Sequence, residues 1–390
     1  MTTDDTFAAG SDTAPDHTAT APARLATRLA FLAAGFMMAC CAPLFPFLKD
    51  NVSADKAQFG VLLLCLGLGS IIAMPATGLL AARRGARPLI LLGGYGMVAM
   101  LPLMALADTP LALGAALFGF GASLGTIDVA MNVHGAEVEG LERRPLMSNF
   151  HAHWSIGGFF GAGLITVLLS LSAPVAICAV LGAASALAAL LLARPRFLSV
   201  AGRAPEPFAI PRGIVLLLAV LASITFLVEG AVLDWGALLI IDRDLASAEN
   251  AGVGYILFSV AMLLARLTGD RLVSRIGGVL TLILGGLATM AGLALVVSAP
   301  VTLGAYSGFI LIGLGAANLV PVLFSAAGRQ KVMPPGIAIA AVTTTGYAGI
   351  LIGPALIGFV SNATSLVTAF WLLALLIMVV PLSAWWAARA

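Results

Sequence analysis

Long apolar runs alternate with short polar breaks along almost the whole chain. A helix needs about 20 predominantly apolar residues to cross the hydrocarbon core of a bilayer. Twelve runs satisfy this requirement, near 26–48, 58–80, 88–107, 111–134, 150–170, 174–193, 213–240, 251–268, 279–298, 302–325, 337–360 and 365–387. The alternating ten-residue segments of a membrane β-barrel do not recur. The pattern therefore predicts an all-α membrane protein with twelve transmembrane helices.

The composition supports a surface that faces lipid. Of the 390 residues, 61% are hydrophobic and 10% are charged, whereas soluble domains carry about 25% charged residues. The formal net charge of +2 gives no reason to expect a nucleic-acid partner. The four cysteines lie in apolar runs without the spacing of a zinc site, so we expect no metal and no cofactor.

The positive charges predict the orientation of the spans. With the N-terminus in the cytoplasm, 17 of the 20 lysines and arginines fall on the cytoplasmic side. This count includes Arg266, which we assign to the connection between spans 8 and 9. Only Lys49, Lys56 and Arg243 fall outside. Such a bias is the positive-inside rule, and it predicts a multi-pass protein of a bacterial inner membrane with both termini in the cytoplasm.

The longest internal polar stretch divides the spans into two groups of six. We expect a disordered cytoplasmic tail at 1–23, a six-helix bundle at 24–193, a cytoplasmic linker at 194–211 and a second six-helix bundle at 212–390. Two equal bundles joined by a linker are typical of transporters built from parallel halves, with the site between them.

The connection between spans 2 and 3 carries a recognisable motif. Gly78, Arg83, Gly85 and Arg87 resemble the signature loop of the major facilitator superfamily, although Ala82 stands where that loop has an acid. The resemblance implies two six-helix bundles and secondary transport.

The matching place in the second half reads Asp270, Arg271, Ser274, Arg275 and Gly277. It keeps an arginine and a glycine but has serine at the position of the acid. Both loops therefore lack the acid that usually interacts with the dipole of a neighbouring helix. The recurrence itself indicates a duplicated bundle, as does the repetition of Gly157-x3-Gly161 in span 5 by Gly349-x3-Gly353 in span 11.

Span 4 carries an acid followed by an amide, Asp128 and Asn132. This pair resembles the corresponding helix of the fucose and glucose/galactose permease branch, in which the acid is implicated in proton coupling. Span 7, with Glu229, Asp234 and Trp235, and the start of span 5 add to the resemblance and point to a bacterial subgroup near those permeases. The first span lacks the acid of the fucose permease, so sugar specificity does not follow.

Physical chemistry favours these acids as site residues. A carboxylate at the centre of a membrane helix costs about 2.5–3.5 kcal/mol on insertion scales, so it turns toward protein or water. Desolvation favours the neutral acid, which makes proton uptake and release feasible. Asp128 and Asn132 are one turn apart and share a helix face, whereas Glu229 and Asp234 lie about 140° apart. Asp234 and Trp235 also fit an anchor at the membrane surface.

Other polar residues within spans are weaker candidates. His151, His153 and Trp154 open span 5, and a histidine there could relay protons or contact solute. The two histidines face different sides of a helix, which argues against a shared metal ion. Asn318 in span 10 must find a hydrogen-bond partner, and Tyr347 in span 11 is a further cavity candidate.

The remaining patterns exclude an ATP-driven pump and an enzyme. No phosphate-binding loop of the G-x-x-x-x-G-K-[ST] type is present, and no nucleophile–base set can be assembled. We expect a monomeric, proton-coupled transporter of a small polar solute such as a sugar or polyol, with a site lined by spans 1, 4, 7 and 10.

Two alternatives remain open at this stage. Efflux of drugs or metabolites by proton antiport is disfavoured because span 5 has Gly161-Ala162 where efflux antiporters carry Gly-Pro. A non-transporting membrane receptor or scaffold is disfavoured because no sizeable soluble segment is present.

Overall fold

The computed structural model describes residues 17–54, 56–199, 211–246 and 253–389. These residues form helices and turns without a strand. The first half contains α1 (His17–Asn51), α2 (Lys56–Arg84), α3 (Arg87–Leu106), α4 (Pro110–Glu142), α5 (Met147–Ser170), α6 (Val175–Ala193) and the short 3-10 helix η1 (Arg194–Arg196). The second half contains α7 (Ile214–Asp242), α8 (Val253–Ser298), α9 (Thr302–Ala316), α10 (Leu319–Arg329), α11 (Pro335–Ala363), α12 (Leu366–Leu376) and α13 (Val379–Ala387).

The described helices account for twelve membrane crossings. The 46 residues of α8 would extend roughly 69 Å, about twice the hydrocarbon thickness. They form two crossings because Gly277, with φ 80° and ψ 162°, breaks the helix. Conversely, α9 and α10 form one crossing interrupted near Asn318, and α12 and α13 form another. The twelve-helix prediction is confirmed.

Some element limits differ from those that we expected. Helix α1 begins at His17, so the last seven residues of the expected tail are helical, and 1–16 lie outside the described residues. Helix α4 continues to Glu142, eight residues beyond the predicted end of span 4. The expected linker begins with η1, and its residues 200–210 lie outside the described part of the chain.

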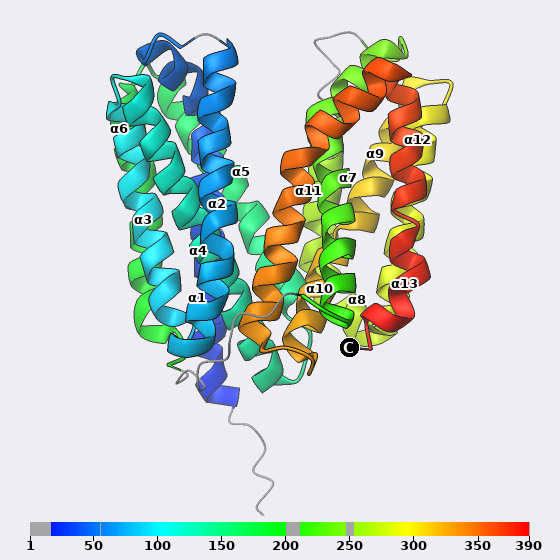
Figure 1. The fold of residues 1–390 in the computed structure, drawn as a ribbon, viewed down its shortest axis with the longest axis horizontal. Helices are drawn as coiled ribbons and strands as arrows, with labels where there is room; N and C mark the ends of the chain where they lie inside the picture. Colours follow the sequence, from blue (N-terminus) through cyan, green and yellow to red (C-terminus); the bar gives the residue numbers. More distant parts are fainter. Residues whose placement is uncertain (1–16, 55, 200–210, 247–252, 390) are drawn as a thin grey trace, which may run out of the picture.

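The helices form two bundles, α1–α6 and α7–α13, which stand side by side (Figure 1). Equivalent contacts recur in them 192 residues apart. A Cβ on Gly121 would lie 1.9 Å from the carbonyl oxygen of Leu66, and a Cβ on Gly313 would lie 2.3 Å from that of Phe258. Glycine is required at both places because two helices approach within backbone contact. The two halves are therefore related structurally as well as by motif.

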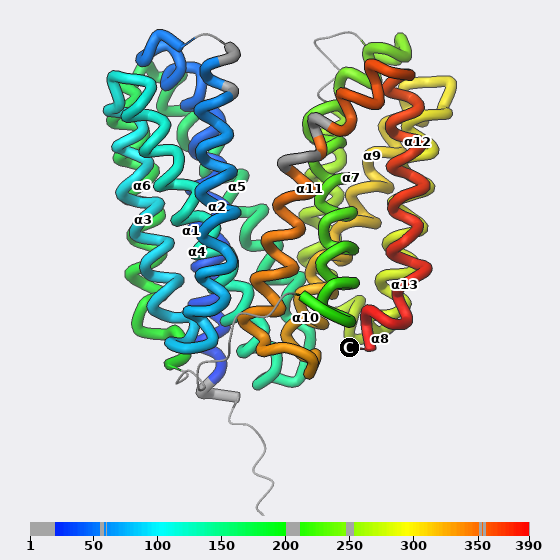
Figure 2. Tube along the Cα trace, viewed as in Figure 1, coloured from blue at the N-terminus to red at the C-terminus, as the bar shows by residue number. Residues whose placement is uncertain are grey.

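The bundles contact each other near the end at which α1 begins and α13 ends, and diverge toward the opposite end (Figure 2). We call the first of these the arginine-rich end, because the connections there carry Arg83, Arg84, Arg87, Arg143, Arg144 and Arg329. The opposite end is called the far end. At the arginine-rich end, a Cβ on Gly78 of α2 would lie 2.3 Å from the Cβ of Ala340 on α11. Similarly, a Cβ on Gly269 of α8 would lie 2.7 Å from the Cβ of Ser148 on α5.

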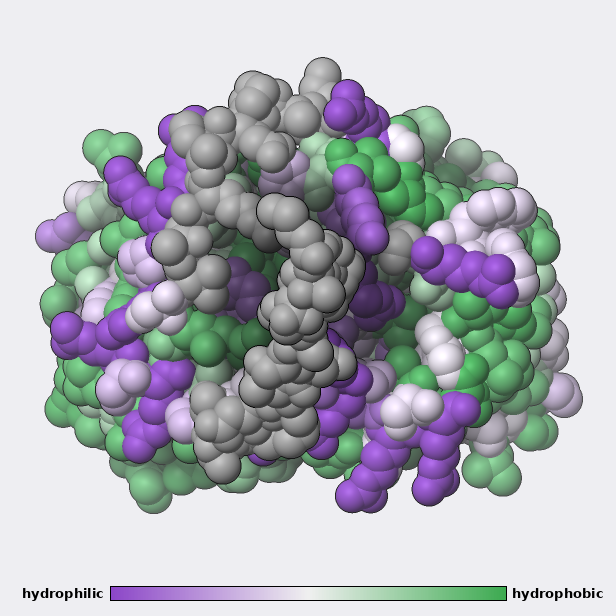
Figure 3. Space-filling view, turned by 90° about the horizontal axis from the view of Figure 1, so that it is seen from below, coloured by the Kyte–Doolittle hydropathy of each residue, from purple (hydrophilic) through white to green (hydrophobic). Residues whose placement is uncertain are grey.

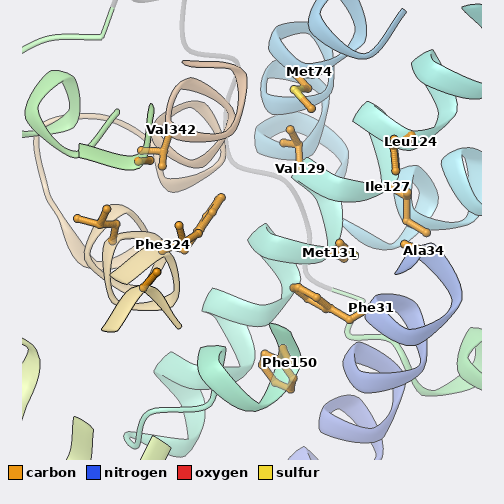
Figure 4. Packing of buried hydrophobic residues seen from close by; sticks show 14 of the residues in the cluster. Phe31, Ala34, Met74, Leu124, Ile127, Val129, Met131, Phe150, Phe324 and Val342 are labelled. Atoms are coloured by element: carbon orange, nitrogen blue, oxygen red, sulfur yellow. The ribbon is translucent and has the colours of Figure 1, made fainter. Parts of the chain in front are cut away.

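Hydrophilic side chains are spread among hydrophobic ones over the surface of the arginine-rich end, and hydrophobic residues predominate toward its edges (Figure 3). In the core behind it, Phe31 of α1 stacks on Phe150 of α5 with ring centroids 5.8 Å apart. Figure 4 shows Phe324, from the second bundle, across from these rings. The Phe31 and Phe324 rings both contact the ring of His151 on α5.

Candidate functional site

Asp128 lies in the buried part of α4, with 7% of its surface exposed. The Asn132 amide Nδ2 donates to the backbone oxygen of Asp128 at 2.9 Å and lies 3.3 Å from its carboxylate Oδ1. The two side chains share a helix face, as their spacing predicted. The Tyr347 hydroxyl on α11 also lies close enough to the Asp128 carboxylate to interact with it. This contact joins the two bundles through a residue from each.

Glu229 on α7 forms an ion pair with Arg266 on α8, with Oε2 3.7 Å from Nη2. Arg266 also donates from Nε to the Ala317 carbonyl at 3.2 Å and from Nη1 to the Ser155 hydroxyl at 3.1 Å. Ser155 belongs to α5, so this arginine also connects the two bundles. The guanidinium thereby holds together three helices and the α9–α10 break.

The assignment of Arg266 to a polar connection was therefore wrong. It is the fourteenth residue of α8, and only 6% of its surface is exposed. The available signal was its place between apolar residues in Ala261-Met-Leu-Leu-Ala-Arg-Leu. A charge in such a run is normally turned to a protein partner, and this one forms an ion pair with a predicted site acid.

His151 on α5 lies between the bundles. Its ring is 5.2 Å from that of Phe31 on α1 and 5.7 Å from that of Phe324 on α10, measured between centroids. It also lies close enough to Arg266 to interact with it electrostatically. His153 instead bonds through Nδ1 to the Asn149 backbone oxygen of its own helix, at 2.8 Å. Of the two histidines, His151 is the one that faces the second bundle.

Several buried polar atoms along this interface have no hydrogen-bond partner among the described residues. They include Asn132 Oδ1, Glu229 Oε1, Asn318 Oδ1, His151 Nε2 and Thr344 Oγ1. The first three are acceptors in the assigned amide orientations, and an unsatisfied buried acceptor costs about 1–3 kcal/mol. Such a set is suited to a solute or to water molecules that supply hydroxyl donors.

Asp234, Trp235 and Trp154 form none of the hydrogen bonds and ion pairs described above. Asp234 is on the exposed side of α7, and Trp235 packs against α11, where a Cβ on Gly358 would lie 3.2 Å from its ring. Trp154 contacts α1 through its backbone, because its carbonyl oxygen would lie 2.2 Å from a Cβ on Gly35. Trp235 and Trp154 therefore contribute to helix packing, whereas Asp234 is a surface position.

Helices outside the expected set provide much of the site. Spans 4, 7 and 10 contribute Asp128, Glu229 and Asn318. However, α5, α8 and α11 supply Ser155, Arg266 and Tyr347, and span 1 contributes the Phe31 ring. Ser155 and Tyr347 are 192 residues apart, so equivalent positions of the two halves each reach a charged residue of the opposite bundle.

The residues of the two loop motifs lie at the arginine-rich end. Gly85 and Gly277 occupy equivalent turns with φ of 76° and 80°, which glycine adopts without strain. Arg87 donates to the Ser199 hydroxyl at 2.7 Å, while Arg83, Arg271 and Arg275 are exposed.

Asp270 contacts the first bundle directly. Its carboxylate accepts from the Asn149 amide at 3.2 Å, in the first turn of α5. An acid at a helix N-terminus is stabilised by the helix dipole. Because Ser274 stands where the motif has its acid, the sequence argued against a contact between an acid and a helix N-terminus. Such a contact is nevertheless present in the second half, and Asp270 forms it.

Sequence reasoning missed two further acids near this end. Glu139 accepts from the amides of Leu146 and Met147 at 2.8 and 3.1 Å and lies 3.5 Å from Arg329 of α10. Glu142 binds Arg24 and Arg144, each at 2.6 Å. Both fell beyond the predicted end of span 4. The acidic run Glu137-Val-Glu139-Gly-Leu-Glu142 was the available signal.

Known proteins resemble this chain along its length. A model of the Major Facilitator Superfamily matches residues 29–331. An uncharacterised MFS-type transporter of Yersinia pestis is 43% identical, covering 93% of this chain and 94% of its own.

Among solved structures, the transporter FucP in its outward conformation superposes with a TM-score of 0.80 at 18% identity, covering 96% of this chain and 100% of its own. The human organic anion transporter MFSD10 gives the same TM-score at 16% identity, covering 94% and 99%. At these identities the likeness concerns the fold. The twelve helices, the duplicated bundles and the match over most of the sequence lead to one assignment: the chain belongs to the Major Facilitator Superfamily and is a membrane transporter, not an enzyme.

Proposed function

We propose that this transporter moves a small, hydroxyl-rich polar solute together with protons by alternating access, acting as a single chain. The observation that carries the proposal is the two acidic groups between the bundles, Asp128 with Asn132 and Glu229 with Arg266, each of which includes a buried acceptor without a hydrogen-bond partner among the described residues. Hydroxyl groups of a sugar or polyol would donate to Asn132, Asn318 and Glu229. The resemblance of Asp128 and Asn132 to the fucose permease branch supports the same solute class.

Asp128 is the proposed proton carrier. It has no cationic partner within ion-pair distance among the described residues, whereas Glu229 is paired with Arg266. A carboxylate that shares its site with a tyrosine hydroxyl and an amide can accept a proton without leaving an unpaired cation. One proton on Asp128 would leave a cluster in which Glu229 and Arg266 balance each other. A neutral solute suits that balance.

The proposed orientation places the arginine-rich end in the cytoplasm, as the positive-inside rule favours. With the bundles in contact at that end, the structure corresponds to an outward-facing state. Solute would enter from the far end, reach the cluster, and be released after the contacts at the arginine-rich end separate. The proposal also places this multi-pass protein in a bacterial inner membrane.

A two-stage experiment tests the proposal. The purified protein is first screened by thermal melting against sugars, polyols, organic acids and drugs, because a ligand that binds the folded state raises the melting midpoint. Solutes that stabilise it are then tested for uptake into proteoliposomes with and without an inward proton gradient. We expect sugars or polyols to stabilise the protein and the gradient to drive their accumulation.

The matched variants are Asp128→Asn and Asp108→Asn. Asp108 is an exposed acid in the connection before α4, so its replacement should leave gradient-driven uptake unchanged. Gradient-driven uptake that persists in Asp128→Asn at the normal rate would remove Asp128 as the proton carrier. Stabilisation by drugs alone would favour efflux instead.

A further inference from the structure

A pocket lies at the arginine-rich end, and neither Asp128 nor Glu229 lines it. Its volume is about 280 Å³, and residues of both bundles line it. The first bundle contributes Arg28, Arg144 and Asn149, and the second contributes Asp270 and Arg271. The pocket is close to the lower limit of about 300 Å³ for small-molecule sites, so it suits a small ligand or a headgroup.

Positive charge exceeds negative charge around this pocket. Glu142 is the only acid within ion-pair distance of Arg24 and Arg144 among the described residues, and it serves both. Asp270 is directed to the N-terminus of α5 through the Asn149 amide. The other nearby acid, Glu139, pairs with Arg329. The acids Glu142 and Asp270 therefore face four arginines, which are Arg24, Arg28, Arg144 and Arg271.

Arg28 and Arg271 retain donors for a ligand. Arg28 donates from Nε to the neutral Asn149 side chain at 2.7 Å, and no carboxylate lies within ion-pair distance of it in the described part of the chain. Arg271 is exposed and likewise lacks a carboxylate at that distance. Leu267, Asp270 and Arg271 follow the spacing of one helix face, which directs Arg271 to the same pocket.

We propose that this pocket binds a phosphate group, held between Arg28 of the first bundle and Arg271 of the second. Guanidinium groups bind phosphate oxygens through paired, charge-assisted hydrogen bonds. Two sources supply this chemistry, an anionic lipid headgroup and a free phosphate. Basic pockets between helices on the cytoplasmic side are suited to lipid headgroups.

Occupation of the pocket would bias the conformation. The two arginines belong to different bundles, and the pocket exists because α5 and α8 are in contact. A ligand with different affinities for two conformations shifts the population toward the one that it binds better. A bound phosphate group would therefore favour the state with contact at the arginine-rich end and slow its separation.

The test uses the full chain in nanodiscs and two sources of phosphate. In phosphatidylcholine nanodiscs, inorganic phosphate is compared with chloride at equal ionic strength. In a second arm, phosphatidylglycerol replaces part of the phosphatidylcholine. The readouts are the melting midpoint and the distance between spin labels placed at Arg84→Cys and Lys331→Cys, two exposed positions on opposite bundles, in a background without the native cysteines.

The variants are Arg271→Gln and the control Arg275→Gln, an exposed arginine of α8 that does not line the pocket. We expect at least one source to raise the midpoint by several degrees and to enrich the short label distance in the unmodified chain and in Arg275→Gln, but not in Arg271→Gln. A response to phosphate identifies a soluble ligand, and a response to phosphatidylglycerol alone identifies a lipid.

Two results would overturn the site: no response in either arm, or an equal response in Arg271→Gln and the unmodified chain. Neither readout requires transport or knowledge of the solute. The outcome is therefore independent of the proposed proton-coupled uptake.

Discussion

The Asp270 carboxylate of α8 accepts a hydrogen bond from the Asn149 amide in the first turn of α5, at 3.2 Å. One residue comes from each bundle, so the contact exists only when the bundles meet at the arginine-rich end. The equivalent place in the other half is the packing of Gly78 against Ala340. At these equivalent positions, the second half contacts the first through the charged Asp270 side chain, whereas α2 and α11 approach each other closely at Gly78.

Replacing the charge at this contact should change the conformational equilibrium. Asp270→Asn removes the interaction of a carboxylate with a helix N-terminus, which is worth about 0.3–1 kcal/mol and up to ~2 kcal/mol when partly buried. We expect the population in contact at the arginine-rich end to fall severalfold, as measured by distances between spin labels on the two bundles. Asp108→Asn, an exposed acid outside the interface, is the control. An unchanged distance distribution in Asp270→Asn would contradict a latch at this position.

Added volume at Gly78 should oppose the same state. In Gly78→Ala the new Cβ would lie 2.3 Å from the Ala340 Cβ and 2.9 Å from the Gly336 carbonyl oxygen, too close for contact. Overpacking costs about 1–3 kcal/mol, so we expect roughly a tenfold loss of the state in contact, by the same distance measurement. Gly140→Ala is the matched control because a Cβ there meets nothing within 4 Å. Equal behaviour of the two variants would show that the approach of α2 to α11 does not limit closure.

The Glu229–Arg266 pair predicts an asymmetric response to mutation. Breaking a buried pair by removing one partner costs about 3–5 kcal/mol. Arg266→Met leaves a carboxyl group that can take up a proton, whereas Glu229→Gln leaves a guanidinium that stays charged. We expect Glu229→Gln to lower the melting midpoint more than Arg266→Met, and the double variant to recover most of the loss. Arg275→Met, on the exposed surface, should remain near the unmodified value. Additive losses in the double variant would show that the two residues are not coupled.

Asp128 should separate proton coupling from solute movement. Once a solute is identified, Asp128→Asn should abolish its accumulation against a gradient but retain exchange of labelled for unlabelled solute. Uptake by the unmodified protein should rise as the pH on the far-end side falls, since the proton is a co-substrate. This pH dependence should flatten in the variant. Loss of exchange together with accumulation would instead assign Asp128 to solute binding.

The sequence predicted the crossings because each one is a local property. A span must be apolar and must satisfy its own backbone hydrogen bonds in lipid, whatever its neighbours are. Its limits were less well predicted where helices extend beyond the apolar run. Helix α4 reaches Glu142 because Glu139 and Glu142 find partners at the bundle ends.

For the site residues too, positions within one helix could be predicted from the sequence, whereas contacts between helices could not. Asp128 and Asn132 could be placed on one face from their spacing, because a helix turn relates them. The partners of these residues could not be predicted in this way. Arg266 is 37 positions from Glu229 and 111 from Ser155, and the sequence offers no period that relates them.

The chain alone thus determined how many helices cross the membrane, where the arginines gather, and which acids lie within apolar spans. Only the tertiary structure decided that Arg266 is a buried partner of Glu229, that Tyr347 reaches Asp128 across the interface, and that Asp270 meets α5. The physical reason is that lipid acts on each segment separately, whereas ion pairs and helix contacts depend on how two bundles are rotated and brought together.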